Sequence, residues 1–126
     1  MTAVCDRAAL AGSLQRLDAW CQAQDYLGWD VYDGLNSRLL AATPLYRSRL
    51  VRLLWIQLFK HLPVNLRPLA RVPKADNPKA LALFIAGLAA QGRSGEAGRL
   101  AARLLAQASP GYGAGAWGYP FPWQAR

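Results

Sequence analysis

Carboxylates and aromatic rings alternate in one short stretch of the chain, between residues 26 and 34. Its members are Tyr26, Trp29, Asp30, Tyr32 and Asp33. Aromatic faces stack on the apolar faces of sugar rings, and paired carboxylates act as acid and base in glycoside cleavage. The stretch therefore indicates carbohydrate chemistry, with Asp30 and Asp33 as candidate catalytic residues. The alternative is a capped loop between helices, because Asp and Gly are ordinary turn residues and a tryptophan often anchors a core.

The stretch 109–126 also concentrates aromatic residues and has no helical period. Five of the 13 aromatics lie in it: Tyr112, Trp117, Tyr119, Phe121 and Trp123. Proline fixes φ near −65° and removes a donor, so Pro120 and Pro122 favour a stiff segment whose rings suit the wall of a cavity. The alternative is an apolar tail folded over helix ends, because exposed rings at this density favour aggregation.

The basic residues are numerous but scattered. The chain carries 15 Lys and Arg against 7 Asp and Glu, for a net charge of +8. Residues 1–36 hold two arginines against five aspartates, so this part is net −3 and the remainder is +11. The basic residues follow no helix-turn-helix, zinc or ribonucleoprotein pattern, and we expect no specific nucleic-acid partner. The acidic first part is expected to face the basic remainder or a polar cavity.

Several other chemistries lack the residues that they need. His61 is the single histidine, and one straight helix would hold Cys5 and Cys21 about 24 Å apart, so both thiols are expected to be reduced and no common zinc set forms. No glycine-rich loop has P-loop or dinucleotide spacing, and no spacing favours a Cys–His or Ser–His pair. We therefore expect no metal, no cofactor and no independent hydrolase, kinase or dehydrogenase.

Length and composition bound the class of protein. The chain has 126 residues, of which 53% are hydrophobic and 17% charged, and this composition argues against disorder. The longest apolar run, 80–88, is shorter than the roughly 18 residues that a membrane span needs. The N-terminus lacks the order of a secretory signal, so we expect a single cytoplasmic domain without a transmembrane segment.

Four helices are predicted to position these residues. Apolar spacing of three and four places the first helix over 5–22. Thr43-Pro44 and Asn77-Pro78 each pair a capping residue with a proline at the first helical position, which predicts helices over 44–61 and 78–91. Gly92 stops that helix, and Ser94 is expected to cap a fourth that runs to residue 108. Three prolines predict an extended or turning connector over 63–76.

The last two predicted helices are expected to pair. The gap at 92–94 is too short for anything but an antiparallel hairpin. Both helices are rich in alanine and nearly apolar all round, and such helices need cover on more than one side. Stacked helical pairs in solenoids and toroids give that cover, although no repeat of fixed period is present. The expected class is all-α.

Four motifs carry a resemblance to a known family: YLGWDVYDGLNS at 26–37, PVNLRP at 63–68, NPKAL at 77–81 and WGYPFPWQ at 117–124. In this order they resemble a bacterial family met near polysaccharide-biosynthesis genes. Members of that family look like (α/α) toroids, similar to six-hairpin glycosidases and terpenoid cyclases, and are several times longer. The resemblance implies that 1–126 is the N-terminal part of a larger toroid, with antiparallel helical hairpins and an aromatic-rich irregular C-terminal segment.

The resemblance also implies a common site, because loops at one end of a toroid line its central cavity. The substrate-binding candidates are Tyr26, Trp29, Tyr32, Asn36, Asn65, Arg67, Trp117, Tyr119, Trp123 and Gln124. The family pattern falls as well on Gly28, Gly34, Pro68, Asn77, Pro78, Lys79, Gly118 and Phe121. Family members continue into further hairpins, so this chain alone is expected to have little activity.

Three functional hypotheses follow. The leading one is a carbohydrate-acting or carbohydrate-binding toroid portion, whose partners are a carbohydrate ligand, the remaining hairpins or a second copy of itself. In full-length form it could be a glycosidase-like enzyme. The second hypothesis is a small basic interaction module that binds an anionic partner with salt-sensitive affinity. The third keeps the toroid and gives its aromatic cavity a prenyl or terpenoid substrate.

Overall fold

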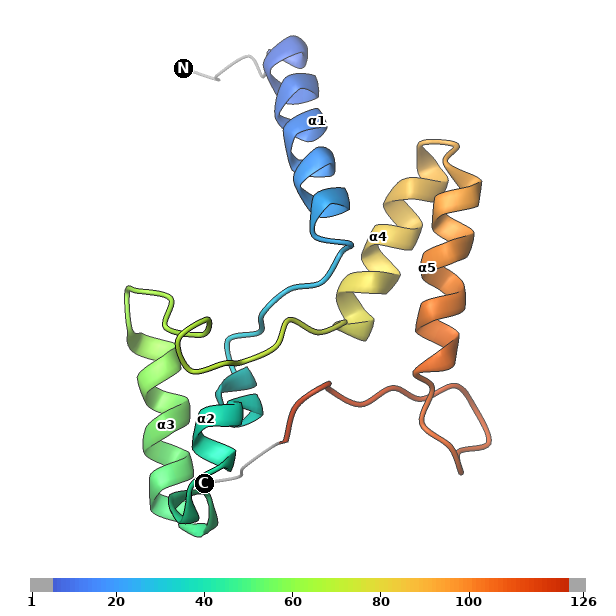
Figure 1. Cartoon of the computed structure of the whole chain (residues 1–126). Coiled ribbons are helices and arrows are strands. Elements are labelled where there is room, and N and C mark those ends of the chain that lie inside the picture. Colours follow the sequence, from blue (N-terminus) through green and yellow to red (C-terminus); the bar gives the residue numbers. More distant parts are fainter. Residues whose placement is uncertain (1–5, 123–126) are drawn as a thin grey trace, which may run out of the picture.

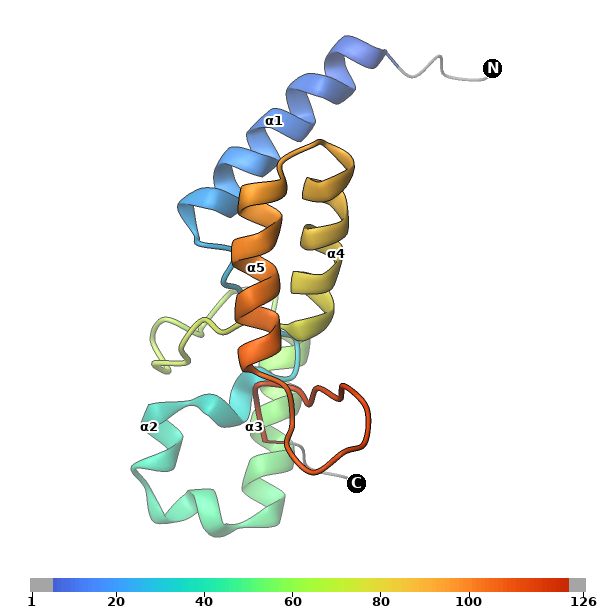
Figure 2. The same ribbon diagram turned by 90° about the vertical axis from the view of Figure 1, so that its right-hand side faces the viewer.

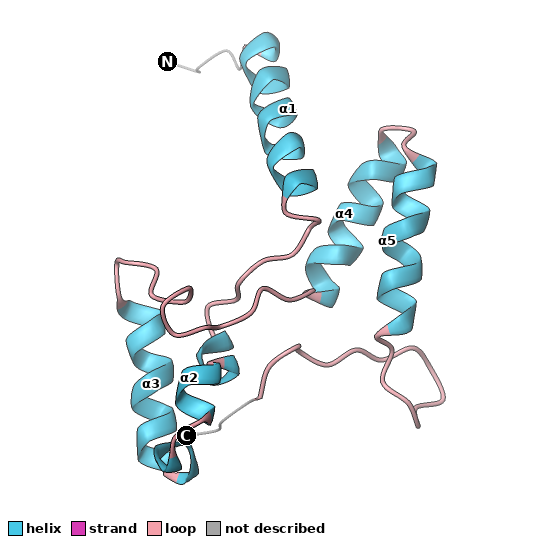
Figure 3. Cartoon of the chain, viewed as in Figure 1, coloured by secondary structure: helices cyan, strands magenta, loops and turns pink. Residues whose placement is uncertain are grey.

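The computed structural model describes residues 6–122, and within this range the chain forms helices and loops without any β-strand (Figures 1 and 3). The elements, with η for a 3-10 helix, are α1 (Arg7–Ala23), η1 (Asp33–Asn36), α2 (Arg38–Ala41), η2 (Pro44–Arg47), α3 (Arg49–His61), α4 (Pro78–Ala90) and α5 (Ser94–Ala106). The expected all-α class is thereby confirmed for the described residues.

Helices α4 and α5 form the predicted antiparallel hairpin (Figures 1 and 2). Asn77 caps α4 by accepting from the amides of residues 79 and 80. Gly92 has a φ of 74°, a left-handed conformation that costs glycine little and lets the chain reverse. Leu81 and Leu100 are completely buried in the hairpin core. The expectation that Ser94 caps α5 is wrong: Ser94 is the first helical residue, and the cap position, Arg93, makes no capping bond through its side chain.

Helix α1 confirms the first predicted helix to within two residues and projects away from the other helices (Figure 1). Only its C-terminal end packs, where the buried thiol of Cys21 joins the hairpin core. Cys21 is free, and burial raises the pKa of its thiol. Leu10, Leu14 and Leu17 remain exposed, so the predicted apolar stripe is present but uncovered. Cys5 lies outside the described residues.

Helices α2 and α3 form a second group with the turns η1 and η2 (Figure 1). The helix predicted from Pro44 is wrong in its first turn, because the extended backbone of Ser48, with ψ 121°, ends η2. Ser48 then caps α3 by accepting from the amide of Val51. The short helix α2 is absent from the prediction, and Ser37 caps it while donating 2.8 Å to the carbonyl of Ala70.

Two loops that lie side by side join these helical groups. Residues 24–32 leave α1, and residues 62–77 lead into α4 without helical structure, as the prolines predict. Gly28 and Ala75 exchange two backbone hydrogen bonds of 3.2 and 2.9 Å between the loops. Trp29 and Val72 then pack with Phe59 of α3 in a small core. The backbone that carries Asp30 is therefore held on both sides.

The acidic first part of the chain faces the basic helix α5, which confirms one of the two expected arrangements. Arg93 pairs with Asp18 of α1 at 2.6 Å, and Arg99 with Asp25 at 2.8 Å. Arg103 reaches Asp25 at 3.0 Å. These ion pairs tie the end of α1 to α5.

Candidate functional site

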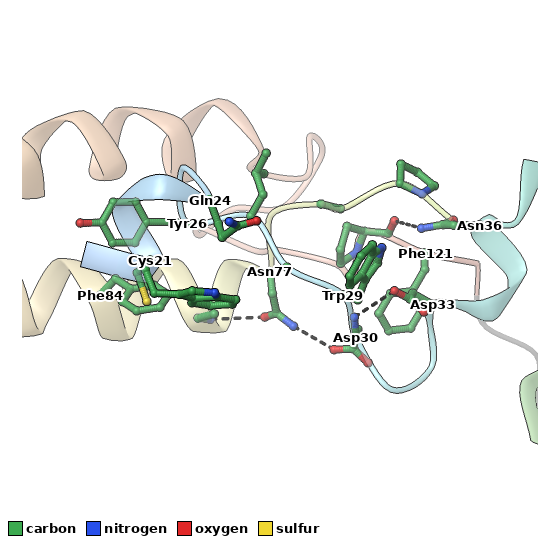
Figure 4. Close-up of a pocket in the computed structure, with 17 residues that line it drawn as sticks. Cys21, Gln24, Tyr26, Trp29, Asp30, Asp33, Asn36, Asn77, Phe84 and Phe121 are labelled. Carbon is green, nitrogen blue, oxygen red and sulfur yellow. Dashed lines mark hydrogen bonds between the residues drawn. The ribbon is translucent and has the colours of Figure 1, made fainter. Parts of the chain in front are cut away.

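A cavity of about 210 Å³ lies where four segments converge (Figure 4). They are the end of α1, the loop 26–36, the stretch from residue 73 into α4, and the tail at 120–121. Its rings are Trp20, Tyr26, Trp29, Phe84 and Phe121, and its polar side chains are Gln24, Asp30, Asp33, Asn36 and Asn77. The geometry thus brings the acidic loop and part of the aromatic tail to one cavity.

Asp33 lines the cavity, and each oxygen of its carboxylate accepts one hydrogen bond. One of its carboxylate oxygens accepts from Arg67 Nε at 2.8 Å, and the other accepts from the backbone amide of Asp30 at 3.0 Å. Both side chains of the ion pair are nearly buried. Burial raises the pKa of the Asp33 carboxyl, and Arg67 and the Asp30 amide oppose that rise. The pair holds the loop in shape.

Arg67 lies in the connector that leads into α4 and holds the acidic loop in place from there. Besides its bond to Asp33, the guanidinium donates 2.8 Å to the carbonyl of Asp30. It also lies 5.5 Å over the ring of Phe59, within the range of a cation–π contact. Asn65 accepts from the Arg67 amide at 3.1 Å and so fixes the turn that presents Arg67. Both candidates act here on the loop itself, and neither lines the cavity.

Asp30 lines the cavity with a carboxylate that is only partly covered. Asn77 donates to one of its oxygens at 3.1 Å (Figure 4). The amide of Tyr32 donates to the other at 3.0 Å. Each oxygen of a carboxylate has more than one lone pair, so these bonds orient the group without using all of its accepting capacity. Asp30 is thus the carboxylate at this site that combines a fixed position with access.

Trp29 is held in place by both its polar edge and its face. Its indole N–H donates 2.9 Å to the carbonyl of Val72, and the ammonium of Lys74 lies 4.8 Å from the ring centre. Lys74 also donates to Gln24 at the end of α1. Trp29 therefore lines the cavity in an orientation that its contacts with Val72 and Lys74 fix.

Asn36 ties the tail to the loop. Its side-chain amide donates 2.9 Å to the carbonyl of Pro120, and Phe121 beside it is buried. Figure 4 shows this bond next to Phe121 and Trp29. The contact spans 84 residues of sequence, so spacing alone gives no sign of it.

Tyr26 turns its hydroxyl away from the cavity toward α5 (Figure 4). The hydroxyl donates to Glu96, and the ring packs edge-on against Phe84 with centres 5.0 Å apart. Burial, reinforced by Glu96, raises the pKa of Tyr26 to about 12. Asp25 and Tyr26 have φ values of 50° and 58°, so a strained turn delivers this ring into the core.

The remaining predicted site residues lie elsewhere. Tyr32 sits outside the cavity with the ammonium of Lys60 over its ring. Trp117 and Tyr119 line a separate hollow of about 380 Å³ beside Lys79, where Trp117 donates 2.7 Å to the carbonyl of Leu104. The predicted residues Trp123 and Gln124 lie outside the described part of the chain.

Sequence reasoning missed three polar or aromatic members of the cavity wall, Trp20, Gln24 and Phe84, and named Asn77 only through the family pattern. Trp20 and Phe84 follow helical apolar spacing, which predicts core positions, and Asn77 follows the pattern of a helix cap. A signal for Trp20 did exist. That signal is its place in the sequence, in the last turn of α1 directly before the acidic loop, and the structure leaves it 60% exposed.

Residues 6–122 contain no group of three or more His, Cys, Asp or Glu side chains placed to hold a metal ion. No helix in this range is long and apolar enough to cross a membrane. Comparison of the chain with family models, curated proteins and solved structures finds no match.

Proposed function

We propose that this chain is the N-terminal portion of a carbohydrate-binding or carbohydrate-acting (α/α) toroid, with the cavity between Trp20, Trp29 and Asp30 as its sugar site. The observation that best supports this proposal is that rings and polar side chains from four separate segments line one cavity. Ligand sites of this kind are mostly apolar, with a few placed polar groups that fix orientation.

The proposed roles follow from how each group is held. Trp20 and Trp29 offer ring surface to the apolar side of a sugar. Asp30 accepts from hydroxyls, or assists at the reacting centre, because its oxygens keep accepting capacity. Asp33 is a positioning residue, since its carboxylate is buried and its charge is paired with Arg67, whereas the carboxylate of Asp30 is partly exposed.

The size of the cavity limits the ligand. At about 210 Å³ it lies below the roughly 300–1,000 Å³ that is typical of sites for drug-sized molecules. One monosaccharide unit suits this volume better than a long oligosaccharide. A longer chain of sugars would have to extend beyond the cavity, and Trp20, which is 60% exposed, offers ring surface for it.

Uncovered apolar faces support the toroid part of the proposal. Leu10, Leu14 and Leu17 are all more than half exposed along α1, and Leu83 and Leu105 are exposed on the outer faces of the hairpin. Leaving apolar area in water costs about 25 cal/mol per Å², which neighbouring hairpins would recover. Self-association of the isolated chain follows from the same faces. Light scattering coupled to size-exclusion chromatography tests this, and a stable monomer would count against it.

The sugar site is tested through Trp20, because this residue lines the cavity and contributes little to the core. Trp20→Ala should weaken binding of a monosaccharide about tenfold, the value of one aromatic contact. The matched control is Leu17→Ala, which removes a similarly exposed side chain of the same helix away from the cavity. Saturation-transfer NMR over a panel of neutral and acidic monosaccharides measures the affinity.

Asp30→Asn gives the complementary test. The amide keeps the size of the side chain but loses the charge and one accepting oxygen, so binding of sugar hydroxyls should fall about tenfold. One of the two bonds from Asn77 and the Tyr32 amide is lost as well, so the unfolding midpoint should fall, and binding is compared at a temperature where circular dichroism shows the variant folded. Binding of an isoprenoid in preference to every sugar tested, or equal sugar binding by Trp20→Ala and the wild type, would overturn the carbohydrate proposal.

A further inference from the structure

The second hollow, of about 380 Å³, adjoins the first cavity. It lies between the start of α4, the end of α5 and the tail, and Asn77 lines both spaces. In the tail, Trp117 and Tyr119 line the second hollow, whereas the next residues, Pro120 and Phe121, line the first cavity. One helix cap and one short run of the tail therefore form the boundary between two neighbouring spaces.

The two rings of the second hollow are held in place. The indole N–H of Trp117 donates 2.7 Å to the carbonyl of Leu104. A Cβ at Gly115 would lie only 2.8 Å from the Trp117 ring, so glycine at this position gives the ring its space. Tyr119 stacks on Phe121 with ring centres 5.3 Å apart, and 65% of its surface stays exposed. The hollow thus offers oriented ring surface, on which the apolar face of a sugar stacks.

The charge in the wall of this hollow is positive. Among the described residues that line it, Lys79 alone is charged, and it is exposed. Lys79 forms no ion pair with any residue in the described part of the chain. Residues 104–122 contain no charged side chain, so the tail brings no counter-charge. Asp76 is already engaged, because Arg103 pairs with it and Gln107 donates 2.7 Å to it. The Lys79 ammonium is therefore available to an anion.

We propose that the second hollow is a second sugar subsite and that the sugar it binds carries an anionic group. Trp117 and Tyr119 stack on this sugar, and the Lys79 ammonium meets its carboxylate or phosphate. A lysine is a compact point charge that pairs with either anion. The uncharged unit occupies the first cavity, because the carboxylate of Asp30 would repel an anion there. This inference rests on the proposed function and names its ligand as an acidic saccharide of at least two units.

Saturation-transfer NMR with the full chain tests the preference for an acidic sugar. The probes are glucose and galactose, the uronate of each and the 6-phosphate of each. At least one acidic form should bind about fivefold more tightly than its neutral parent, the attraction of two unit charges about 4 Å apart in water. The preference should shrink as salt is raised to about 0.5 M, and the tighter of the two acidic forms identifies the anion. Equal binding of acidic and neutral forms would overturn this inference and leave the carbohydrate proposal standing, whereas no binding of any sugar would overturn both.

Variants with matched controls assign the preference to this hollow. Lys79→Gln should abolish the preference for the acidic sugar and leave the affinity for the neutral one unchanged. Its control, Arg49→Gln, removes an exposed cation of α3 outside the hollow and should keep the preference. Tyr119→Ala should weaken binding of the acidic sugar about tenfold, whereas Tyr112→Ala, an exposed ring of the tail outside the hollow, should not. All four side chains are exposed, so circular dichroism should show native helix content. A preference that survives in Lys79→Gln would overturn the assignment.

Simultaneous binding of two sugars tests whether the subsites are separate and adjacent. The neutral hexose should leave the acidic sugar bound, and nuclear Overhauser effects should connect the two ligands, because Asn77 lines both spaces. Trp20→Ala should weaken binding of the neutral hexose and leave that of the acidic sugar unchanged, since Trp20 lines the first cavity only. Complete competition between the two sugars would place both at one site and refute the second subsite.

Discussion

Replacing Arg67 by methionine tests whether a buried ion pair holds the acidic loop. Arg67 donates to the carboxylate of Asp33 and to the carbonyl of Asp30, and its guanidinium packs over Phe59. Arg67→Met keeps most of the volume and removes the charge, which leaves Asp33 buried without its cation. Breaking a buried pair in this way costs about 3–5 kcal/mol. We expect the free energy of unfolding to fall by about 3 kcal/mol, the lower end of this range, because the Asp30 amide still donates to Asp33.

A double-mutant cycle separates this interaction from the packing of the methionine. Asp33→Asn removes the buried negative charge, so in its background Arg67→Met should cost at least 1.5 kcal/mol less, about the coupling of a direct pair. Urea denaturation followed by circular dichroism measures all four proteins. Additive losses, or a cost below about 1 kcal/mol for Arg67→Met alone, would refute the assigned role.

The pH dependence of the cycle has a definite sign. Burial already raises the pKa of Asp33, and loss of Arg67 raises it further, so the folded variant binds a proton at pH values where the unfolded chain has released it. Its stability therefore rises as pH falls toward the unfolded value of about 3.9. The difference in free energy of unfolding between Arg67→Met and the double variant Arg67→Met, Asp33→Asn should become smaller as the pH is lowered from 7 to 4. A constant deficit would contradict the argument.

Two further predictions concern the packing around the hairpin. The pKa of Tyr26 is raised to about 12, so the folded chain keeps this proton when the unfolded chain loses it near 10, and stability should fall between pH 10 and pH 12 by at most about 2.7 kcal/mol. Thermal melts of the wild type and Tyr26→Phe should show this loss only in the wild type. Leu100→Ala should cost about 2–5 kcal/mol because its side chain is fully buried, whereas Leu105→Ala on the exposed face should change the free energy of unfolding by less than about 0.5 kcal/mol. Equal losses would show that α5 packs by another face.

Helix positions were largely predictable because their signals are local. Asn77-Pro78 and Gly92 mark the ends of α4 through a side-chain cap and a left-handed residue, and neither depends on distant contacts. The same logic failed at Thr43-Pro44, where the signal starts a 3-10 turn and Ser48 provides the true cap of α3. A proline sets φ for one residue, whereas the length of the helix that follows depends on what the next turn packs against.

Candidate site residues divide in a similar way. Trp29, Asp30 and Asn36 were predicted from residue chemistry or from the family resemblance, and all three line the cavity. Tyr32 and Asn65 were named on the same grounds and lie outside it. Neighbours in a loop can point to opposite sides, and residue type does not reveal which side faces a cavity.

The sequence by itself determined the all-α class, the hairpin of α4 and α5, and the presence of an acidic and aromatic loop. These follow from spacing, caps and composition, which act over a few residues. Only the tertiary structure decided that Asp33 is held by Arg67, that Asn36 binds the tail at Pro120, and that Asp30 stays accessible beside Trp20. Each of these depends on segments tens of residues apart meeting through packing, and the free energy of such contacts is not encoded in any single stretch of sequence.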